Sequence, residues 1–534
     1  MVKRRSTKQL SFSEFNHPFI GCGLSTENRW VKLARILPWD KIEQDYLGSL
    51  SAETGAPSIS SRIVIGALII KHIENYSDER TIEMIRENPY MQYFCGLKEF
   101  TELPLFDPSL FVTLRKRIGR EDYKRWLKYT LDNTGMGNTD SQDNDSQDQE
   151  TTGKLDSKSA ESSVSVNDLP DHENKGSIKI DATVAPADIR FPTDVNLLND
   201  ARQKAEELID TLYLQSTLVI KPRTYRQKAR EDFISFIKRR KKQKNLVKKA
   251  VKKQLNYLRR DIEIIYMLLD ELDQRQVGWG LTQAQMKYLY VIQELYRQQW
   301  YMFHNQTHQI GHRIVSIHQP HVRPIVRGKA GKETEFGAKI NVSLSEGLAV
   351  IEQFDWEAFN EGCFLVEVLD NYKKRKGCYP ELVQVDSIYL TRENRRFMKE
   401  NGIRHIGKAL GRPTKEELTR KQLRQRKAET AERNQIEGLF GVAKRRYMLE
   451  RVRARLSSTS KSWISASFFV MNLLRLAKMP FLFVWILSYL RTMWSMLYKK
   501  TPFISIKGTK RLTIFNGYNF RVPFLRIKTV ILPS

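Results

Sequence analysis

Apolar residues recur at helical spacing through the N-terminal part of the chain. Residues 29–47 follow this spacing on both sides of Pro38, which we expect to divide them into two helices because proline cannot sit inside a helix. Residues 61–97 predict two further helices. Another is expected over 107–119, with Asp107 as its cap. The pattern therefore predicts an all-helical N-terminal domain.

The composition changes abruptly after this helical domain, which we assign to residues 1–132. Residues 133–176 are polar and acidic, and they contain too few large apolar side chains to offset the entropy of ordering. We predict an acidic disordered linker there, and we expect limited proteolysis to release two folded pieces. The second piece is assigned to residues 177–478, and 479–534 form a C-terminal extension of unassigned role.

The second piece mixes strand-like and helix-like patterns. Residues 177–185 alternate apolar and polar positions up to Asp181, as a strand does, and a helical insertion of about 196–312 follows. The order of the remaining elements predicts a mixed α/β domain. These elements are a hairpin at 335–356 that turns at 345–347, a helix at 361–377, a strand over 381–387 that ends at Asp386, a helix at 391–401, a strand at 403–409 and a long helix from about 415.

Charge narrows the class of partner. The 534 residues include 89 Lys and Arg against 61 Asp and Glu, a net charge of +28, which indicates a polyanionic partner such as nucleic acid or an anionic membrane. The apolar run at 480–490 is too short to span a bilayer, and we expect a buried helix there. Four separated cysteines argue against a disulfide framework or a structural zinc site: Cys22, Cys95, Cys363 and Cys378.

The densest positive charge lies within the predicted insertion. Residues 221–260 contain 17 Lys and Arg and only two acidic residues, Glu231 and Asp232. Apolar residues run along one side of the helix expected there, so the basic side chains can lie along phosphates. Packing against a partner helix, for which 282–304 is the candidate, is the alternative role of this helix. The lysines that we expect to contact DNA are Lys248, Lys249, Lys252 and Lys253.

Three carboxylates stand at positions that suit phosphoryl transfer. Asp181 and Asp386 lie at or just after buried strands, and Glu437 lies on the long helix. Two divalent ions about 3.5–4 Å apart can activate the nucleophile and stabilise the leaving oxygen, and carboxylate oxygens are the ligands that Mg²⁺ and Mn²⁺ prefer. Carboxylates from separate parts of the chain must converge to hold such ions.

The helix that carries Glu437 has an informative face. Arg433, Glu437 and Lys444 are spaced i, i+4 and i+11, which puts them on one side. Cations beside a metal-binding carboxylate would hold phosphates, while a simple Arg433–Glu437 surface ion pair, worth about 0.3–0.5 kcal/mol, is the plainer alternative. Arg445 and Arg446 extend the basic end of the helix. The stripe expected to pack on the sheet consists of Ile436, Phe440, Ala443 and Tyr447.

Two other sets of residues compete for these roles. Asp188 and Asp194 lie near Asp181, but Asp181 ends the apolar alternation, whereas Asp194 follows Pro192 in a predicted loop. Three histidines, spaced i, i+4 and i+8, could ligate a metal from one helical face, although no carboxylate partner accompanies them. Solvated or phosphate-facing side chains are the preferred interpretation for His304, His308 and His312.

The chain resembles the DDE-type transposases of bacterial insertion sequences. The N-terminal resemblance runs through SRIVIGALIIKHIENYSDERTIEMIRENPYMQYFCGL, and the catalytic motifs are DATVAPADIRFPTDVNLLNDAR, RPIVRGKAGKETEFGAKINVS, DSIYLTRENRRF and RNQIEGLFGVAKRRY. Together they cover most of residues 15–475 in the family's order. Arg433, Glu437 and Lys444 match the family's residues around the last acid, whereas the tyrosine often found three residues before that arginine is Thr430 here.

The resemblance implies an RNase H-like catalytic domain whose DDE triad is Asp181, Asp386 and Glu437. It implies two Mg²⁺ or Mn²⁺ ions per active site, and double-stranded DNA as partner, both the terminal inverted repeats of the element and the target. It also implies a homo-oligomer, a dimer in the DNA complex, in the bacterial cytoplasm at the nucleoid, without membrane binding.

We therefore predict a DNA transposase that binds the ends of its own element and cuts and rejoins DNA. A nuclease of the same fold without strand transfer is one alternative. A non-catalytic DNA-binding repressor of the element is another, and the intact triad argues against it. A membrane-surface protein is a more distant alternative, which sedimentation with anionic vesicles would detect.

Overall fold

The structure is a computed structural model that describes residues 24–51, 58–134, 173–329, 332–406, 420–478, 509–514 and 518–523. The chain divides into a first unit that ends at Met479 and a second that begins at Pro480. Most of the predicted linker, the apolar run at 480–490 and Cys22 lie outside the described residues. In the second unit, β7 (Thr509–Ile514) and β8 (Tyr518–Pro523) pair as antiparallel strands.

The N-terminal part of the first unit is helical, as predicted. Proline separates α1 from α2, and Ser77 caps α4 by accepting a hydrogen bond from the Arg80 amide. Residues 61–97 contain three helices rather than two, because Asn88 caps an additional helix that begins with Pro89. The helices are α1 (Arg29–Ile36), α2 (Trp39–Gly48), α3 (Ser61–Glu74), α4 (Asp78–Glu87), α5 (Pro89–Phe94), α6 (Leu110–Arg117) and α7 (Arg120–Asn133).

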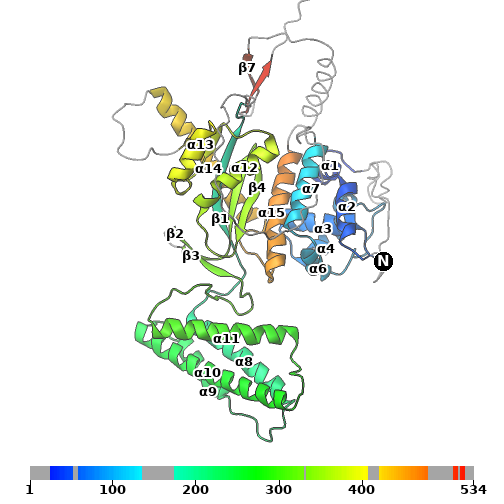
Figure 1. Ribbon diagram of the computed structural model, residues 1–534. Coiled ribbons are helices and arrows are strands. Elements are labelled where there is room, and N and C mark those ends of the chain that lie inside the picture. The colour runs from blue at the N-terminus through cyan, green and yellow to red at the C-terminus, as the bar shows by residue number, and fades with distance from the viewer. Residues whose placement is uncertain are drawn as a thin grey trace, which may run out of the picture. The chain divides into compact units, whose positions relative to one another are not determined.

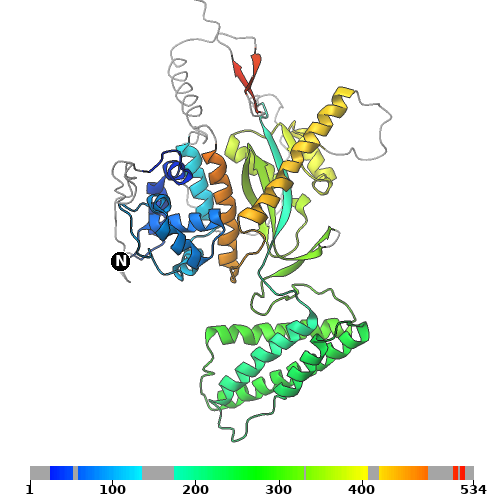
Figure 2. The same cartoon turned by 180° about the vertical axis from the view of Figure 1, so that it is seen from behind.

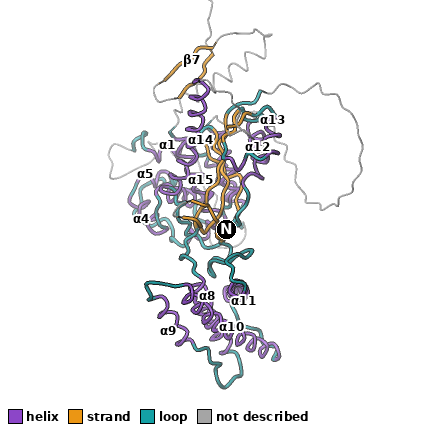
Figure 3. Tube along the Cα trace, turned by 90° about the vertical axis from the view of Figure 1, so that its left-hand side faces the viewer, coloured by secondary structure: helices purple, strands orange, loops and turns teal. Residues whose placement is uncertain are grey.

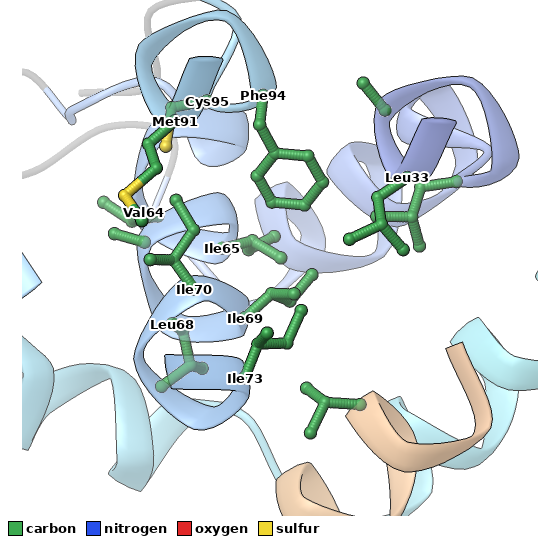
Figure 4. Close-up of a cluster of buried hydrophobic side chains, with 14 of the residues drawn as sticks. Leu33, Val64, Ile65, Leu68, Ile69, Ile70, Ile73, Met91, Phe94 and Cys95 are labelled. Carbon is green, nitrogen blue, oxygen red and sulfur yellow. The ribbon is translucent and has the colours of Figure 1, made fainter. Parts of the chain in front are cut away.

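Two details of this helical part differ from the sequence-based expectation. Helix α6 begins at Leu110, and Asp107 accepts a hydrogen bond from the Ser109 amide at 2.9 Å, so this aspartate caps the turn before the helix rather than the helix itself. Helix α7 was not predicted at all, although its Trp126 is almost fully buried. Figure 4 shows the apolar side chains of α3 and α5 that form the centre of this core.

The core of these helices also contains a segment from the far end of the unit. Helix α15 (Ser457–Ala477) packs against α1, α3, α6 and α7. Its buried residues Phe469, Val470 and Leu473 belong to the same apolar cluster as Trp30 and Trp126. This packing differs from the expectation of two separately folded pieces, because the last helix assigned to the second piece completes the core of the first.

A mixed six-stranded sheet forms the centre of the second part. The strands run in the order β2-β3-β1-β5-β6. The sixth strand, β4, also pairs with β3, along the part of β3 that follows its pairing with β2. Strand β1 pairs antiparallel with β3 and parallel with β5, and β5 pairs parallel with β6. The strands are β1 (Ser177–Pro186), β2 (Arg323–Lys329), β3 (Lys332–Ser345), β4 (Leu348–Asp355), β5 (Leu382–Gln384) and β6 (Arg404–Ile406).

The predicted hairpin is confirmed. Strands β3 and β4 are joined by Glu346 and Gly347, both with positive φ, which suits a tight two-residue turn. Strand β2 was not predicted, and it pairs with the first half of β3. Strand β6 is described only to Ile406, so the rest of the strand predicted over 403–409 lies outside the described residues.

Helices cover both faces of the sheet. On one face α12 (Leu365–Lys376) and α13 (Arg392–Glu400) share an apolar core with β1 and β5 (Figure 1). On the other face α14 (Arg420–Arg446) crosses the strands, as its yellow ribbon shows in Figure 2, and it shares a core with β3, β4 and α15. Two short 3₁₀ helices, η1 (Glu361–Phe364) and η2 (Ser387–Tyr389), follow β4 and β5.

The chain between β1 and β2, where the insertion was predicted, forms helices. Its four helices pack around an apolar core of their own, and they appear as a bundle of purple tubes in Figure 3. The helices are α8 (Asp194–Tyr213), α9 (Arg226–Ile237), α10 (Lys244–Gln274) and α11 (Gln283–His304). Within the described residues, no helix has the length and apolar character needed to cross a membrane.

Candidate active site

Asp181 lies in the middle of the sheet. It is on β1, opposite Val342 of β3, and its carboxylate is half-buried. The amide of Ala182 donates a hydrogen bond to Asp181 Oδ1 at 2.8 Å. The strand that the alternation of Ile178 and Ile180 predicted is thus present, and both isoleucines are fully buried.

Asp386 lies two residues beyond the end of β5, the strand that runs parallel to β1. Lys179 of β1 pairs with Gln384 of β5, and each aspartate follows its paired residue by two positions. The ladder itself ends at Gln384 rather than at Asp386 as predicted, because Asp386 turns the chain into η2 by accepting a hydrogen bond from the Ser387 amide at 2.7 Å. One carboxylate therefore lies on β1, and the other follows the end of the adjacent strand β5.

Glu437 is carried by α14, which packs on β1 and β5. The predicted apolar stripe is confirmed, since Ile436, Phe440 and Ala443 are buried against the sheet and Tyr447 is half-buried. The Glu437 side chain is 57 % exposed, and its Oε1 lies 3.5 Å from Arg433 Nη2. The side chain of Thr430 lies outside the described residues.

The electrostatics of Asp181 connect these elements. Burial, the largest effect, raises the pKa of Asp181 to about 6. The negative charges of Glu361 and Glu437 raise this pKa further, while the Ala182 amide and the positive charge of Arg433 lower it. Arg433 thus stands near both acids, where a cation is needed to balance charge that converges from separate segments.

The donor chemistry of this site fits a hard divalent cation. Asp181, Asp386 and Glu437 offer only carboxylate oxygens, which Mg²⁺ and Mn²⁺ prefer. In the described part of the chain no three His, Cys, Asp or Glu side chains stand close enough together to hold an ion. Like charges repel without a cation between them, and the exposed Glu437 pairs with Arg433 instead.

The rival aspartates are engaged elsewhere. Asp188 accepts a hydrogen bond from Arg451 Nε at 2.6 Å, and Asp194 Oδ1 lies 2.9 Å from Arg313 Nη2. The position of Asp194 after Pro192 predicted a loop, but Asp194 is the first residue of α8. These ion pairs connect the base of the insertion to neighbouring segments, and they give both aspartates a structural role.

The basic residues around the site differ in their surroundings. Lys444 Nζ lies 3.5 Å from Glu335 Oε1, and Arg445 and Arg446 are exposed. On α10, Leu255, Leu258 and Ile262 are buried, which confirms the apolar side expected for this helix. Helix α10 packs on α11, the candidate partner, and also along α8.

The four lysines singled out on α10 are exposed. One of them, Lys253, pairs with Asp232 at 2.6 Å, and Lys248 Nζ lies 6.0 Å from the centre of the Phe303 ring. The other two, Lys249 and Lys252, are therefore the least engaged of the set in the contacts that the structure shows.

The three histidines do not share a helical face. Helix α11 ends at His304, whose ring stacks on Trp300, and the other two lie beyond the helix. His308 lies 4.0 Å from Asp194, and His312 pairs with Glu357 at 2.9 Å. The spacing that suggested a metal site required a continuous helix, which the chain does not form there.

Glu361 lies close enough to Asp181 to raise its pKa, and the sequence pattern did not single it out. An acidic residue in the first turn of a helix is common because it complements the helix dipole. Such a residue therefore carries no functional signal in the sequence alone.

Comparison with known proteins finds two domain families in the chain. Residues 21–117 match the family described as transposase domain (DUF772), and residues 383–474 match the transposase DDE domain. An uncharacterized protein of Rhizobium meliloti, ORF8 in the nfe locus, is 33 % identical over 102 residues, which are 19 % of this chain and 49 % of that protein. The chain thus spans about half the length of that relative. No solved structure matches this chain. The two domain matches, in this order, confirm the predicted resemblance to the transposases of bacterial insertion sequences.

Proposed function

We propose that this chain is a DNA transposase that binds the ends of its own element and performs metal-dependent strand cleavage and strand transfer. The observation that supports the proposal is that Asp181 lies on β1, that Asp386 follows the adjacent parallel strand β5, and that the helix of Glu437 packs on both strands. The mixed sheet, in which β1 lies between an antiparallel and a parallel neighbour, supports an RNase H-like fold.

In this proposal Asp181, Asp386 and Glu437 hold two divalent ions, Mg²⁺ or Mn²⁺. Bound ions would activate the attacking oxygen and stabilise the leaving oxygen. Asp181 contributes rigidity because it lies on β1, and the exposed Glu437 can turn from Arg433 toward a cation. Once Glu437 has turned, Arg433 is released to contact a DNA phosphate.

DNA contacts outside the catalytic residues would come from exposed basic side chains. We assign phosphate binding to Lys444, Arg445 and Arg446 at the end of α14, and to the lysines of α10. Such contacts supply affinity and orientation without reading sequence. Recognition of the inverted repeats is assigned to the N-terminal helices, and the active complex is proposed to be a dimer.

Cleavage and joining of DNA that carries the element's ends test this proposal. Asp181→Asn, Asp386→Asn and Glu437→Gln should each abolish both reactions while end binding persists, because affinity comes mainly from phosphate contacts elsewhere. Asp188→Asn and Asp194→Asn are matched controls and should stay active, since their partners are Arg451 and Arg313.

The outcomes separate the alternatives. Cleavage without joining would indicate a nuclease, and metal-independent end binding without cleavage would indicate a repressor. An Asp181→Asn variant that cuts at the wild-type rate would remove Asp181 from the active site.

A further inference from the structure

Glu361 is held by an ion pair beside the proposed triad. Its Oε1 lies 2.8 Å from Lys339 Nζ, and the two side chains are only 16 % and 14 % exposed. Lys339 also donates to the carbonyl oxygen of Phe359 at 2.7 Å. The lysine is therefore tied to the segment that precedes η1, and it keeps the Glu361 carboxylate in a defined position.

The segment that carries Glu361 is fixed to the segment that begins with Asp386. A Cβ atom at Gly362 would lie 2.6 Å from the carbonyl oxygen of Ile388, so η1 approaches η2 as closely as a glycine permits. Asn394 Nδ2 donates to the carbonyl oxygens of Gly362, at 2.7 Å, and of Tyr389, at 2.8 Å. Glu361 and Asp386 therefore have little freedom to move apart.

The hydroxyl of Tyr389 is buried and is influenced by three of these acids. The side chain is fully buried, and its hydroxyl donates to Asn341 Oδ1 at 2.8 Å. Burial is the main cause that raises the pKa of this hydroxyl far above its usual value. Nearby negative charges raise this pKa further. These charges belong to Glu361, Asp181 and Asp386.

We propose that Glu361 is a fourth carboxylate of the active site, whose negative charge attracts the divalent cations, and that Lys339 is its counter-ion in the metal-free protein. This inference rests on the proposed function, since it assumes that the cations bind at Asp181 and Asp386. Lys339 opposes a cation and holds Glu361 in place, so the two side chains of the pair act on metal affinity in opposite directions.

Calorimetric titration of the full chain with Mn²⁺ alone, at pH 8 and without DNA, tests this inference. Glu361→Gln keeps the shape of the side chain and removes its charge, and it should weaken Mn²⁺ binding about tenfold or more. Lys339→Met removes the positive charge and should tighten binding. Glu346→Gln is the matched control, because Glu346 forms an ion pair of the same 2.8 Å length with Lys376 but is 63 % exposed. It should bind Mn²⁺ as the wild type does.

The signs of the two effects separate a metal-site role from a structural one. Suppose that the pair only stabilises the fold and that both variants keep the wild-type circular dichroism spectrum. Glu361→Gln and Lys339→Met should then either leave Mn²⁺ binding unchanged or both weaken it. Either result overturns the inference. Asp181→Asn tests the underlying function separately. If it lowers Mn²⁺ affinity and Glu361→Gln does not, the triad stands and the role of Glu361 is refuted. If the wild type binds no Mn²⁺, the proposed function fails as well.

Discussion

Helix α15 offers a direct test of whether the N-terminal helices and the sheet fold as one unit. Two neighbouring phenylalanines of this helix belong to different cores. Phe468 is buried with α14 and the sheet, whereas Phe469 is buried among the N-terminal helices. The ring of Phe469 lies 5.7 Å from that of Tyr123 and 6.2 Å from that of Trp126.

Truncation of either ring should destabilise both parts of the unit. Phe469 is 2 % exposed and Phe468 is 3 % exposed, so each alanine substitution removes a fully packed aromatic side chain. Such substitutions cost about 3–5 kcal/mol in free energy of unfolding. If α15 joins the two cores into one cooperative unit, this loss is shared, because neither core can stay folded after α15 leaves.

Native-state hydrogen exchange, read by mass spectrometry on peptides from α3 and β3, measures both cores in one sample. Phe469→Ala should lower the free energy of opening in α3 and in β3 by similar amounts, and Phe468→Ala should do the same. Lys461→Ala, an exposed position on the same helix, is the control and should change either value by less than about 0.5 kcal/mol. Faster exchange in α3 alone after Phe469→Ala would refute the argument and restore the two-piece interpretation.

Three further predictions concern charge. Replacing the exposed lysines of α10 by glutamine should weaken DNA binding equally for all sequences and lower the salt slope by about one unit per lost phosphate contact, measured by fluorescence anisotropy; an unchanged slope would mean that α10 faces protein. Burial is the main cause that raises the pKa of Asp261 to about 8. Between about pH 4 and 8 the folded protein therefore binds more protons than the unfolded chain. Its free energy of unfolding falls as the pH rises through this range. Asp261→Asn should therefore stabilise the insertion in urea unfolding, with a gain that grows by up to about 1.4 kcal/mol per pH unit across that window, and a pH-independent gain would contradict the shift. Because the pKa of Asp181 is about 6, protons should compete with Mn²⁺ below that pH, so calorimetry should show affinity falling from pH 7 to 5 in the wild type but not in Asp181→Asn.

Local patterns in the sequence were sufficient for two of the elements that carry the proposed triad, β1 and α14. Alternation around Ile178 and Ile180 predicted β1, because side chains on a strand point alternately to its two faces. The stripe of Ile436, Phe440 and Ala443 predicted the buried face of α14, because residues three and four apart share one side of a helix. These rules depend only on neighbours along the chain.

The sequence was a poorer guide wherever a role depends on distant residues. The spacing of His304, His308 and His312 suggested a common face, but α11 ends at the first of them. Glu361 looked like an ordinary helix-start residue, and only its contact with Lys339 and the nearness of Asp181 reveal its role. Periodicity reports which side of an element is buried, but not what it is buried against.

The division into domains depended most strongly on tertiary structure. Composition marks the acidic segment after the N-terminal helices, most of which lies outside the described residues. Composition contains no information about the packing of α15. The apolar residues of this helix are buried in two cores, with Phe468 in one and Phe469 in the other. A helix that is apolar on nearly all sides must be buried on all sides, but the sequence does not say between which partners. Only the fold shows that α15 joins the N-terminal helices to the sheet that carries Asp181.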